Sequence, residues 1–180
     1  MLPERLLAGP VVLRRFVAAD APRVELLAGE REVAQTTALI PHPYPAGAAA
    51  AWIATHGAAS AAGTEYTYAI TELDGALVGA IGLRPRPAER ENLGYWIGRA
   101  FWGRGYATAA ARAMLAIAFG LLDLDALTAA HLARNAASGR VMEKCGLRLL
   151  RIERREHRGA PEDFCVRGIT RAGWERVTGE

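Results

Sequence analysis

A glycine-rich turn before an expected helix is the first stretch of this sequence that indicates chemistry. Gly103 and Gly105 flank Arg104, and residues 108–119 follow them, rich in alanine and with apolar residues at helical spacing. The first N–H groups of a helix have no partner within the helix and lie at the positive end of its dipole. Such a turn therefore favours anions, phosphate above all. The alternative is an ordinary strand–helix connection that needs glycine for its conformation.

Two better-defined phosphate loops do not fit this turn. A Walker A loop requires Lys and then Ser or Thr after its last glycine, but Tyr106 and Ala107 follow Gly105. The dinucleotide fingerprint Gly-x-Gly-x-x-Gly requires glycine where Thr108 stands, and it belongs after a first strand rather than past the middle of a chain. The turn therefore predicts a pyrophosphate site of another type.

Length and composition describe an ordinary globular chain. Its 180 residues are 51% hydrophobic and 23% charged, with a formal net charge of +3, and we expect one domain spanning residues 1–180. Basic and acidic residues interleave, so no nucleic-acid stripe is indicated. We expect no secretory signal and no membrane span. Cys145 and Cys165 have no metal-binding spacing, so we expect reduced thiols, no metal and a cytoplasmic location.

The remaining pattern places the turn in a mixed α/β layer. We predict strands at residues 11–16, 65–73, 76–83, 94–98, 126–132, 147–156 and 162–170. We predict helices at 20–29, 30–34, 46–62, about 105–119 and 135–144. Asp20 is expected to begin or cap its helix, and Asp74-Gly75 is a hairpin signal. This order of elements favours a sheet with a crossover helix and helices on its faces.

Two blocks of the sequence resemble one enzyme family. The first runs from Asn92 to Thr108 and contains Gly-Tyr-Trp-Ile-Gly, and the second runs from Asn135 to Leu147. In this order, with a strand between them, they resemble the GNAT superfamily of acetyl-CoA-dependent N-acetyltransferases. Within it the chain is similar to the RimJ/RimL branch, which includes ribosomal-protein N-terminal acetyltransferases. Trp102 stands where the general pattern has Gln or Arg, a variant that this branch uses.

The resemblance covers about residues 11–177 and implies an α/β (α+β) fold. This would be a mixed, mostly antiparallel sheet of about seven strands, splayed at a V-shaped CoA slot, with helices on both faces. Main-chain groups near Trp96, Ile97 and Gly98 would pair with the pantetheine arm like an added strand. Main-chain N–H groups of the turn would hold the pyrophosphate, at Gly103, Arg104, Gly105, Tyr106, Ala107 and Thr108.

The second block would add contacts from the far side of the slot. Asn135 would hydrogen-bond the pantetheine arm, or cap a helix, or do both. Lys144 would contact the nucleotide or only complement the helix dipole. The Arg104 side chain would either add charge near the phosphates or be solvated.

The implied reaction is attack of a neutral amine on the acetyl thioester carbon. A main-chain N–H near Trp96 or Ile97 would stabilise the oxygen that becomes negative. Ser138, three residues after the motif asparagine, is the candidate partner of the leaving thiolate, with Tyr95 and Tyr106 as alternatives. Ser138 could instead be a first-turn hydroxyl that satisfies the helix backbone.

A general base is not evident in the sequence. Asn92 stands where relatives often carry Glu, and it cannot accept a proton at neutral pH. Its neighbour Glu91 would face the opposite side of a strand. His131 is the catalytic candidate, although a lone strand histidine is more often structural. An acceptor α-amine, with a reference pKa of about 7.7–8.0 against about 10.4 for lysine, would need no dedicated base.

The acceptor is expected to be a primary amine, either a peptide N-terminus, such as that of a ribosomal protein, or a small molecule. Its pocket would be built from residues 36–44, Trp52 and the loops at 84–91 and 157–163. Tyr44 and Trp52 would either form an apolar wall or pack in the core, and His42 would line the acceptor site. The chain would be a monomer or homodimer. Two alternatives stay open: a non-catalytic CoA-binding regulatory module, and a protein that binds ATP or NAD at the glycine turn.

Overall fold

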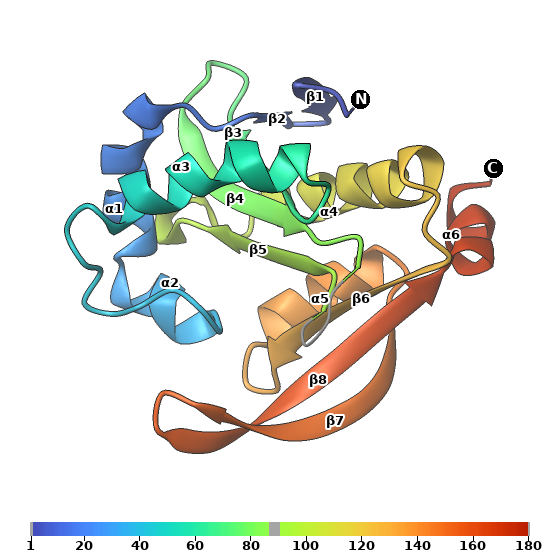
Figure 1. The fold of residues 1–180 in the computed structure, drawn as a ribbon. Helices are drawn as coiled ribbons and strands as arrows, with labels where there is room; N and C mark the ends of the chain where they lie inside the picture. The colour runs from blue at the N-terminus through green and yellow to red at the C-terminus, as the bar shows by residue number, and fades with distance from the viewer. Residues whose placement is uncertain (1, 87–90, 180) are drawn as a thin grey trace.

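One eight-stranded sheet runs through the chain in the computed structural model, which describes residues 2–86 and 91–179 (Figure 1). Its strands are β1 (Arg5–Ala8), β2 (Val11–Arg14), β3 (Tyr66–Thr71), β4 (Leu77–Leu83), β5 (Leu93–Ile97), β6 (Ala126–Leu132), β7 (Arg148–His157) and β8 (Ala160–Thr170). Their spatial order is β1-β2-β3-β4-β5-β6-β8-β7. Neighbouring strands are antiparallel except β5 and β6, which are parallel. The predicted mixed, mostly antiparallel sheet is confirmed.

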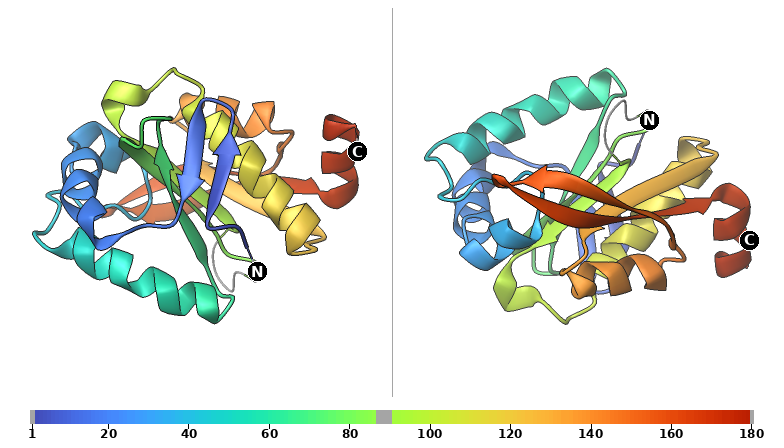
Figure 2. Two further views of the ribbon diagram at one scale, coloured as in Figure 1. Left: turned by 90° about the horizontal axis from the view of Figure 1, so that it is seen from above. Right: turned by 90° about the horizontal axis from the view of Figure 1, so that it is seen from below.

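Helices cover both faces of this sheet, as predicted. They are α1 (Ala21–Ala28), α2 (Arg31–Thr36), α3 (Ala48–Ala61), α4 (Tyr106–Ala116), α5 (Ala136–Lys144) and α6 (Arg171–Thr178). α1 and α3 share one apolar cluster on one face, and α4 and α5 contribute to a larger cluster on the opposite face (Figure 2). A π-helical turn over Ile117–Leu121 continues α4. None of the described helices is long and apolar enough to cross a membrane.

The alternation of β5 decides which side chains reach each face. Leu93, Tyr95 and Ile97 pack into the α4–α5 cluster, whereas Trp96 packs against the α1–α3 cluster. Gly94 shares the Trp96 side because successive residues of a strand point to opposite faces. The face of β5 toward α4 and α5 therefore carries the Tyr95 ring and hydroxyl. On the opposite face, Gly94 has no side chain and leaves open space.

Two elements were not predicted from the sequence. β1 forms a hairpin with β2 through Gly9, whose φ of +58° is in the left-handed region, and it raises the strand count from about seven to eight. α6 is capped by the Thr170 hydroxyl, which accepts from the Gly173 N–H at 3.2 Å. Its Trp174 ring lies 5.5 Å from that of Phe119, so the helix is held by a tertiary contact.

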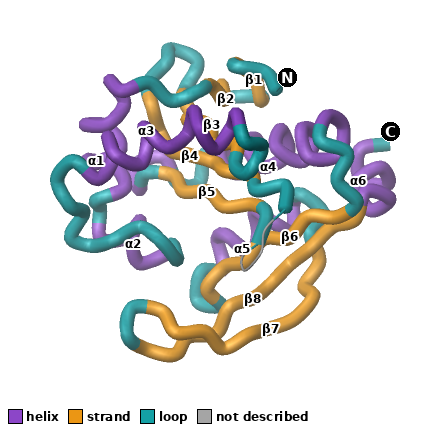
Figure 3. The backbone as a smooth tube through the Cα atoms, viewed as in Figure 1, coloured by secondary structure: helices purple, strands orange, loops and turns teal. Residues whose placement is uncertain are grey.

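Two predicted ends also differ from the structure. Asp20 stands at the N-cap position of α1 but makes no side-chain cap bond. Its carboxylate instead accepts two hydrogen bonds from the Arg14 guanidinium, at 2.7 and 2.8 Å, and one from the Val17 N–H at 2.9 Å, and a bidentate guanidinium–carboxylate pair is among the strongest hydrogen-bonded pairs. β8 runs through Pro161, which was assigned to the turn. The long β7–β8 hairpin extends past the end of β6 there, so the missing N–H is needed by no neighbour (Figure 3).

Candidate active site

β5 and β6 diverge from a single point of contact. Their parallel register holds one pair, Leu93 opposite Ala129. Beyond it the strands open into a cavity of about 1350 Å³ that is lined from both sides. The predicted V-shaped splay is confirmed, with its closed end at this pair.

Asn92 braces that closed end. Its amide is buried, with Oδ1 accepting from the Thr128 N–H at 3.0 Å and from the Thr128 hydroxyl at 3.1 Å. Its Nδ2 donates to the Arg84 carbonyl at 2.9 Å. The side chain therefore joins β6 to the β4–β5 pair by hydrogen bonds. This structural role needs both a donor and an acceptor, which an amide has and an ionised carboxylate lacks.

Only part of the predicted main-chain contact set faces the slot. Gly98 N–H donates to the Val78 carbonyl at 2.8 Å, and the unbroken β4–β5 register pairs Trp96 with Ala80. Alternate residues of an antiparallel strand direct their amides to the same neighbour, so Trp96 and Gly98 bond to β4 and Ile97 faces the slot. The Ile97 carbonyl accepts from the Trp102 indole N–H at 2.7 Å. Of Trp96, Ile97 and Gly98, Ile97 is therefore the residue whose N–H faces the slot, where an oxyanion would form.

The glycine turn opens the start of α4 to the cavity. Gly103 and Gly105 have φ angles of +77° and +79°, and no atom lies within 4 Å of the position that a Cβ would take on either residue. Gly105 is the N-cap and supplies no side-chain partner for the first amides of the helix. The cavity lining here includes Gly103, Gly105, Tyr106, Ala107 and Thr108. The shape and the dipole of this turn fit a pyrophosphate.

Arg104 does not join that lining. Its Nη1 lies 3.4 Å from Glu72 Oε1, and its guanidinium stacks 5.3 Å from the centre of the Phe101 ring. Tyr106 also donates to Glu72, at 2.6 Å. In this arrangement the Arg104 main chain, rather than its side chain, belongs to the turn.

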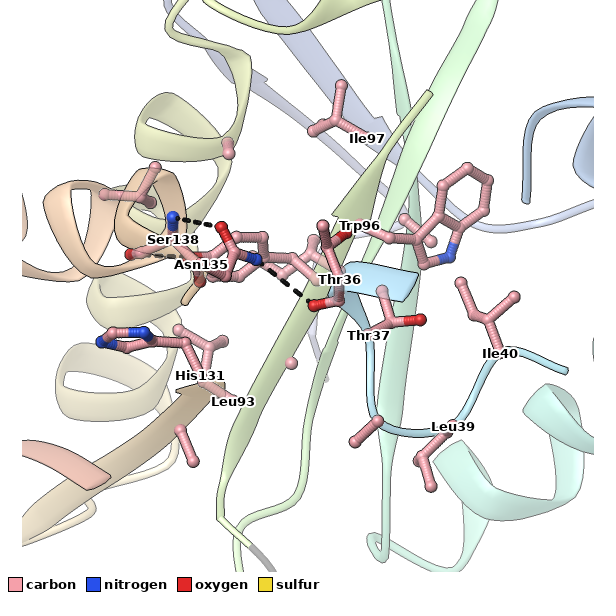
Figure 4. A pocket seen from close by; sticks show the side chains of 18 of the residues that line it. Thr36, Thr37, Leu39, Ile40, Leu93, Trp96, Ile97, His131, Asn135 and Ser138 are labelled. Atoms are coloured by element: carbon pink, nitrogen blue, oxygen red, sulfur yellow. Dashed lines mark hydrogen bonds between the residues drawn. The ribbon is translucent and has the colours of Figure 1, made fainter. Parts of the chain in front are cut away.

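The N-terminus of α5 forms the opposite wall (Figure 4). Asn135 caps the helix: its Oδ1 accepts from the Ser138 N–H at 3.1 Å, and its Nδ2 donates to the Thr36 carbonyl at 3.3 Å. The Ser138 hydroxyl lies 2.8 Å from the Tyr95 hydroxyl. Burial raises the pKa of Tyr95 to about 12, so its hydroxyl keeps its proton near neutral pH. Two of the candidate thiolate partners are thus one hydrogen-bonded pair.

Two cations line the cavity from α5. Lys144 was predicted, and Arg140 was missed although it stands four residues earlier and so shares the same helix face. The spacing of four was the available signal. Both bring positive charge to the cavity lining.

His131 lies on the face of β6 covered by α5. Its Nδ1–H donates to the Leu132 carbonyl at 2.9 Å, and its Nε2 accepts from Arg167 Nε at 3.2 Å. A Cβ on Gly139 would come within 3.0 Å of the ring, so α5 packs directly on it. Figure 4 shows the ring directed away from Trp96 and Thr36. With both nitrogens committed, the geometry favours a structural role over the predicted catalytic one.

On the α1–α3 face the cavity continues as a second compartment. Its apolar wall comprises Leu39, Ile40, Tyr44, Trp52 and Trp96. Its floor is made of small residues, Ala80, Gly82 and Gly94. Arg84 and Glu91 of the predicted acceptor loop line it, and residues 87–90 of that loop lie outside the described residues. The exposed His42 is not part of the lining; its Nδ1 lies 3.2 Å from the Gly29 carbonyl.

Side chains also tie the end of α2 and the loop after it to the β7–β8 hairpin and the β6–α5 loop. His157 Nε2 donates to the Thr37 carbonyl at 3.0 Å, and Arg158 donates to the Ala34 carbonyl at 2.8 Å. Arg134 donates to the Gln35 carbonyl at 2.9 Å. These bonds hold one edge of the second compartment against the slot. Within residues 2–86 and 91–179, no three His, Cys, Asp or Glu side chains group as a metal site would require.

Comparison with known proteins agrees with this geometry. A family model described as an acetyltransferase (GNAT) domain matches residues 11–148. No curated protein matches. A GNAT-family acetyltransferase from Bacillus anthracis superposes with a TM-score of 0.81 at 20% identity, covering 93% of this chain and 99% of that one.

Two further solved structures contain coenzyme A or acetyl-CoA. RimL, a ribosomal L7/L12 alpha-N-protein acetyltransferase in complex with coenzyme A, gives a TM-score of 0.82 at 15% identity, covering 93% of this chain and 98% of that one. The microcin C7 self-immunity acetyltransferase MccE, in complex with acetyl-CoA and AMP, gives 0.77 at 16% identity, covering 90% and 93%. The chain belongs to the GNAT family of acetyl-CoA-dependent N-acetyltransferases, in its RimJ/RimL-like branch.

Proposed function

We propose that this protein transfers the acetyl group of acetyl-CoA directly to a primary amine while both reactants occupy one cavity. The observation that carries the proposal is the continuity of that cavity. It runs from the glycine turn, along the slot between β5 and β6, into the compartment on the α1–α3 face. Two reactants held at the ends of one such cavity meet at the splay, which removes much of the entropic barrier.

The co-substrate side fits the residues present. The amides at the start of α4 and the cations Arg140 and Lys144 would hold the phosphates. Asn135 and the slot-facing main chain of β5 would flank the pantetheine arm. Acetyl-CoA supplies an activated thioester whose carbon the amine attacks, and the products are an amide and free CoA thiol.

Three groups on this chain would assist the transfer. The Ile97 N–H would donate to the thioester oxygen as it gains negative charge. The Ser138 hydroxyl would give its proton to the departing sulfur and recover one from the amine nitrogen, so the amine proton ends on the thiol. Tyr95 would donate to Ser138 Oγ and thereby direct the serine hydrogen elsewhere. Asn92 cannot accept a proton near neutral pH, and both ring nitrogens of His131 are hydrogen-bonded. This favours an acceptor that is already partly neutral near pH 7–8, such as an α-amine.

The acceptor would be a peptide N-terminus or a small-molecule amine. The structural neighbour RimL is named for acetylation of the α-amine of ribosomal L7/L12, and the weak-base argument points the same way. The chain would act as one domain, as a monomer or homodimer, without a metal.

A thiol-release assay with acetyl-CoA and a panel of peptide N-termini and small amines tests the proposal. We expect release that depends on the amine and that falls in Ser138→Ala. Calorimetric binding of acetyl-CoA with no release across a broad panel would instead identify a non-catalytic CoA-binding module. Tight binding of ATP or NAD without binding of CoA would refute the assignment of the glycine turn.

A further inference from the structure

Glu65 lies over the glycine floor of the second compartment. Its Oε1 is 3.1 Å from the position that a Cβ on Gly82 would take, so the carboxylate stands directly above that residue. Gly82 pairs with Gly94 on β5, and no atom lies within 4 Å of the Cβ position on Gly94. The open space above Gly94 is therefore bordered by the Glu65 carboxylate on one side and by the splay between β5 and β6 on the other.

This carboxylate is held less firmly than two others that line the same cavity. Glu91 and Glu153 both receive hydrogen bonds from the Arg155 guanidinium. Glu65 accepts from the Thr67 hydroxyl at 3.3 Å, and its nearest guanidinium nitrogen, on Arg84, is 3.5 Å away. A carboxylate with such long contacts retains capacity for a closer cation.

The surroundings favour an ammonium group with an apolar neighbour. Tyr44, Trp52 and Trp96 line the compartment beside this floor. His56 packs against Trp52 at 4.5 Å between ring centres, and burial lowers the pKa of its imidazole, so it brings no competing charge at neutral pH. Arg84 is the cation that an incoming ammonium would displace in part.

We propose that Glu65 is the carboxylate that binds the acceptor's ammonium group, and that the acceptor carries an apolar group next to its amine. This rests on the proposed function, because the space above Gly94 is where an acceptor would approach the thioester. Glu65 then determines specificity for amines over neutral isosteres. An apolar group on the acceptor would pack on the Tyr44–Trp52–Trp96 wall.

Calorimetry on the protein saturated with CoA tests this without requiring turnover. The probes are leucinamide and its neutral isostere 2-hydroxy-4-methylpentanamide. A charge-assisted hydrogen bond predicts that the wild type binds the amine about tenfold or more tightly than the alcohol. Glu65→Gln keeps the size and the Thr67 contact but should bind both probes within about twofold of each other, since no charge remains to distinguish them. Glu65→Asp should keep part of the preference, and Glu175→Gln on α6 controls for loss of one negative charge.

Turnover separates this inference from the proposed function. In Glu65→Gln, kcat/KM for the amine should fall about tenfold or more, mainly through KM, while the KM for acetyl-CoA is unchanged. Thiol release that is insensitive to Glu65→Gln overturns the role of Glu65 and leaves the enzyme assignment intact. Amine binding that Glu65→Gln abolishes, without thiol release from the wild type, supports the ammonium site and refutes the enzyme assignment. Equal affinity of the wild type for amine and alcohol overturns the inference outright.

Discussion

Removing the Asn92 amide should destabilise the protein by opening the closed end of the slot. Asn92 is 7% exposed and makes hydrogen bonds at 2.9, 3.0 and 3.1 Å to β4 and β6. Asn92→Ala removes all of them and leaves three partly buried polar groups, on Arg84 and Thr128, without this partner. At about 1 kcal/mol for each bond, the free energy of unfolding should fall by about 3 kcal/mol. For a chain of this size that corresponds to a fall in Tm of about 6–12 °C.

Urea denaturation monitored by circular dichroism measures this change, provided that the m-value stays constant. Thr128→Val is the matched control because it removes only the hydroxyl, and it should cost about 1 kcal/mol. In the double variant the effects should not add, since Thr128 and Asn92 share a bond. Asn92→Glu is informative as well: it restores the residue that relatives often carry, yet should lower stability and raise no activity. A fall of less than about 0.5 kcal/mol in the free energy of unfolding of Asn92→Ala, which is the range of ordinary surface substitutions, would refute this structural role of Asn92.

Three further changes test other parts of the structure. Gly105→Glu should abolish CoA binding in calorimetry because a carboxylate would occupy the anion site, whereas Gly105→Asn, which tolerates a positive φ, should retain it. Ser138→Ala should lower kcat about 10²-fold with little change in acetyl-CoA affinity, as expected for a lost proton donor, and Tyr95→Phe should lower it less. Burial alone would raise the pKa of Asp20, but hydrogen bonds from Arg14 and the Val17 N–H lower it overall. The stabilisation by the Asp20 carboxylate is therefore present above the unfolded-state pKa of about 3.9 and is lost as pH falls through the folded-state pKa. In urea titrations from about pH 7 to about pH 2.5, the free energy of unfolding should therefore fall less on acidification in Asp20→Asn than in the wild type.

Elements with a long, regular pattern were predictable from the sequence. β6 was predicted at residues 126–132 and is observed at Ala126–Leu132, because alternation and β-favouring residues agree there. α4 begins at Tyr106, directly after the glycine turn. β1 and α6 escaped prediction because neither carries a clear apolar pattern: α6 has no buried residue and β1 has one, and partners elsewhere in the fold stabilise them.

The location of the half of the site that we propose for the co-substrate was also predictable, for a physical reason. It is formed largely by main-chain groups and helix N-termini within two short blocks, and local sequence determines where glycines and caps occur. The prediction did not extend to the direction of each amide. Whether Ile97 or Trp96 faces the slot depends on the register with β4, and register is a long-range property.

Several residues that line the proposed acceptor half, such as Tyr44, Trp52 and Arg84, lie in the predicted segments, but the contacts that bring these segments together were not predictable. Asn135 meets the Thr36 carbonyl across 99 positions, and His157 meets the Thr37 carbonyl across 120. No local pattern encodes such pairs. The same separation explains why His131 was predicted as a catalytic residue: its residue type fits the chemistry, whereas its hydrogen bond from Arg167 comes from a residue 36 positions away.

This division between the two halves has a functional consequence. The slot depends on backbone geometry, so we expect few substitutions to be tolerated at Gly103, Gly105 and Asn92. The second compartment depends on side chains such as Glu65, Tyr44 and Trp52, which can change without disturbing the sheet that carries the slot. If the two halves bind acetyl-CoA and the acceptor as proposed, acceptor selectivity can vary while acetyl-CoA recognition is retained, and variants at Glu65 should alter the choice of amine with CoA affinity unchanged.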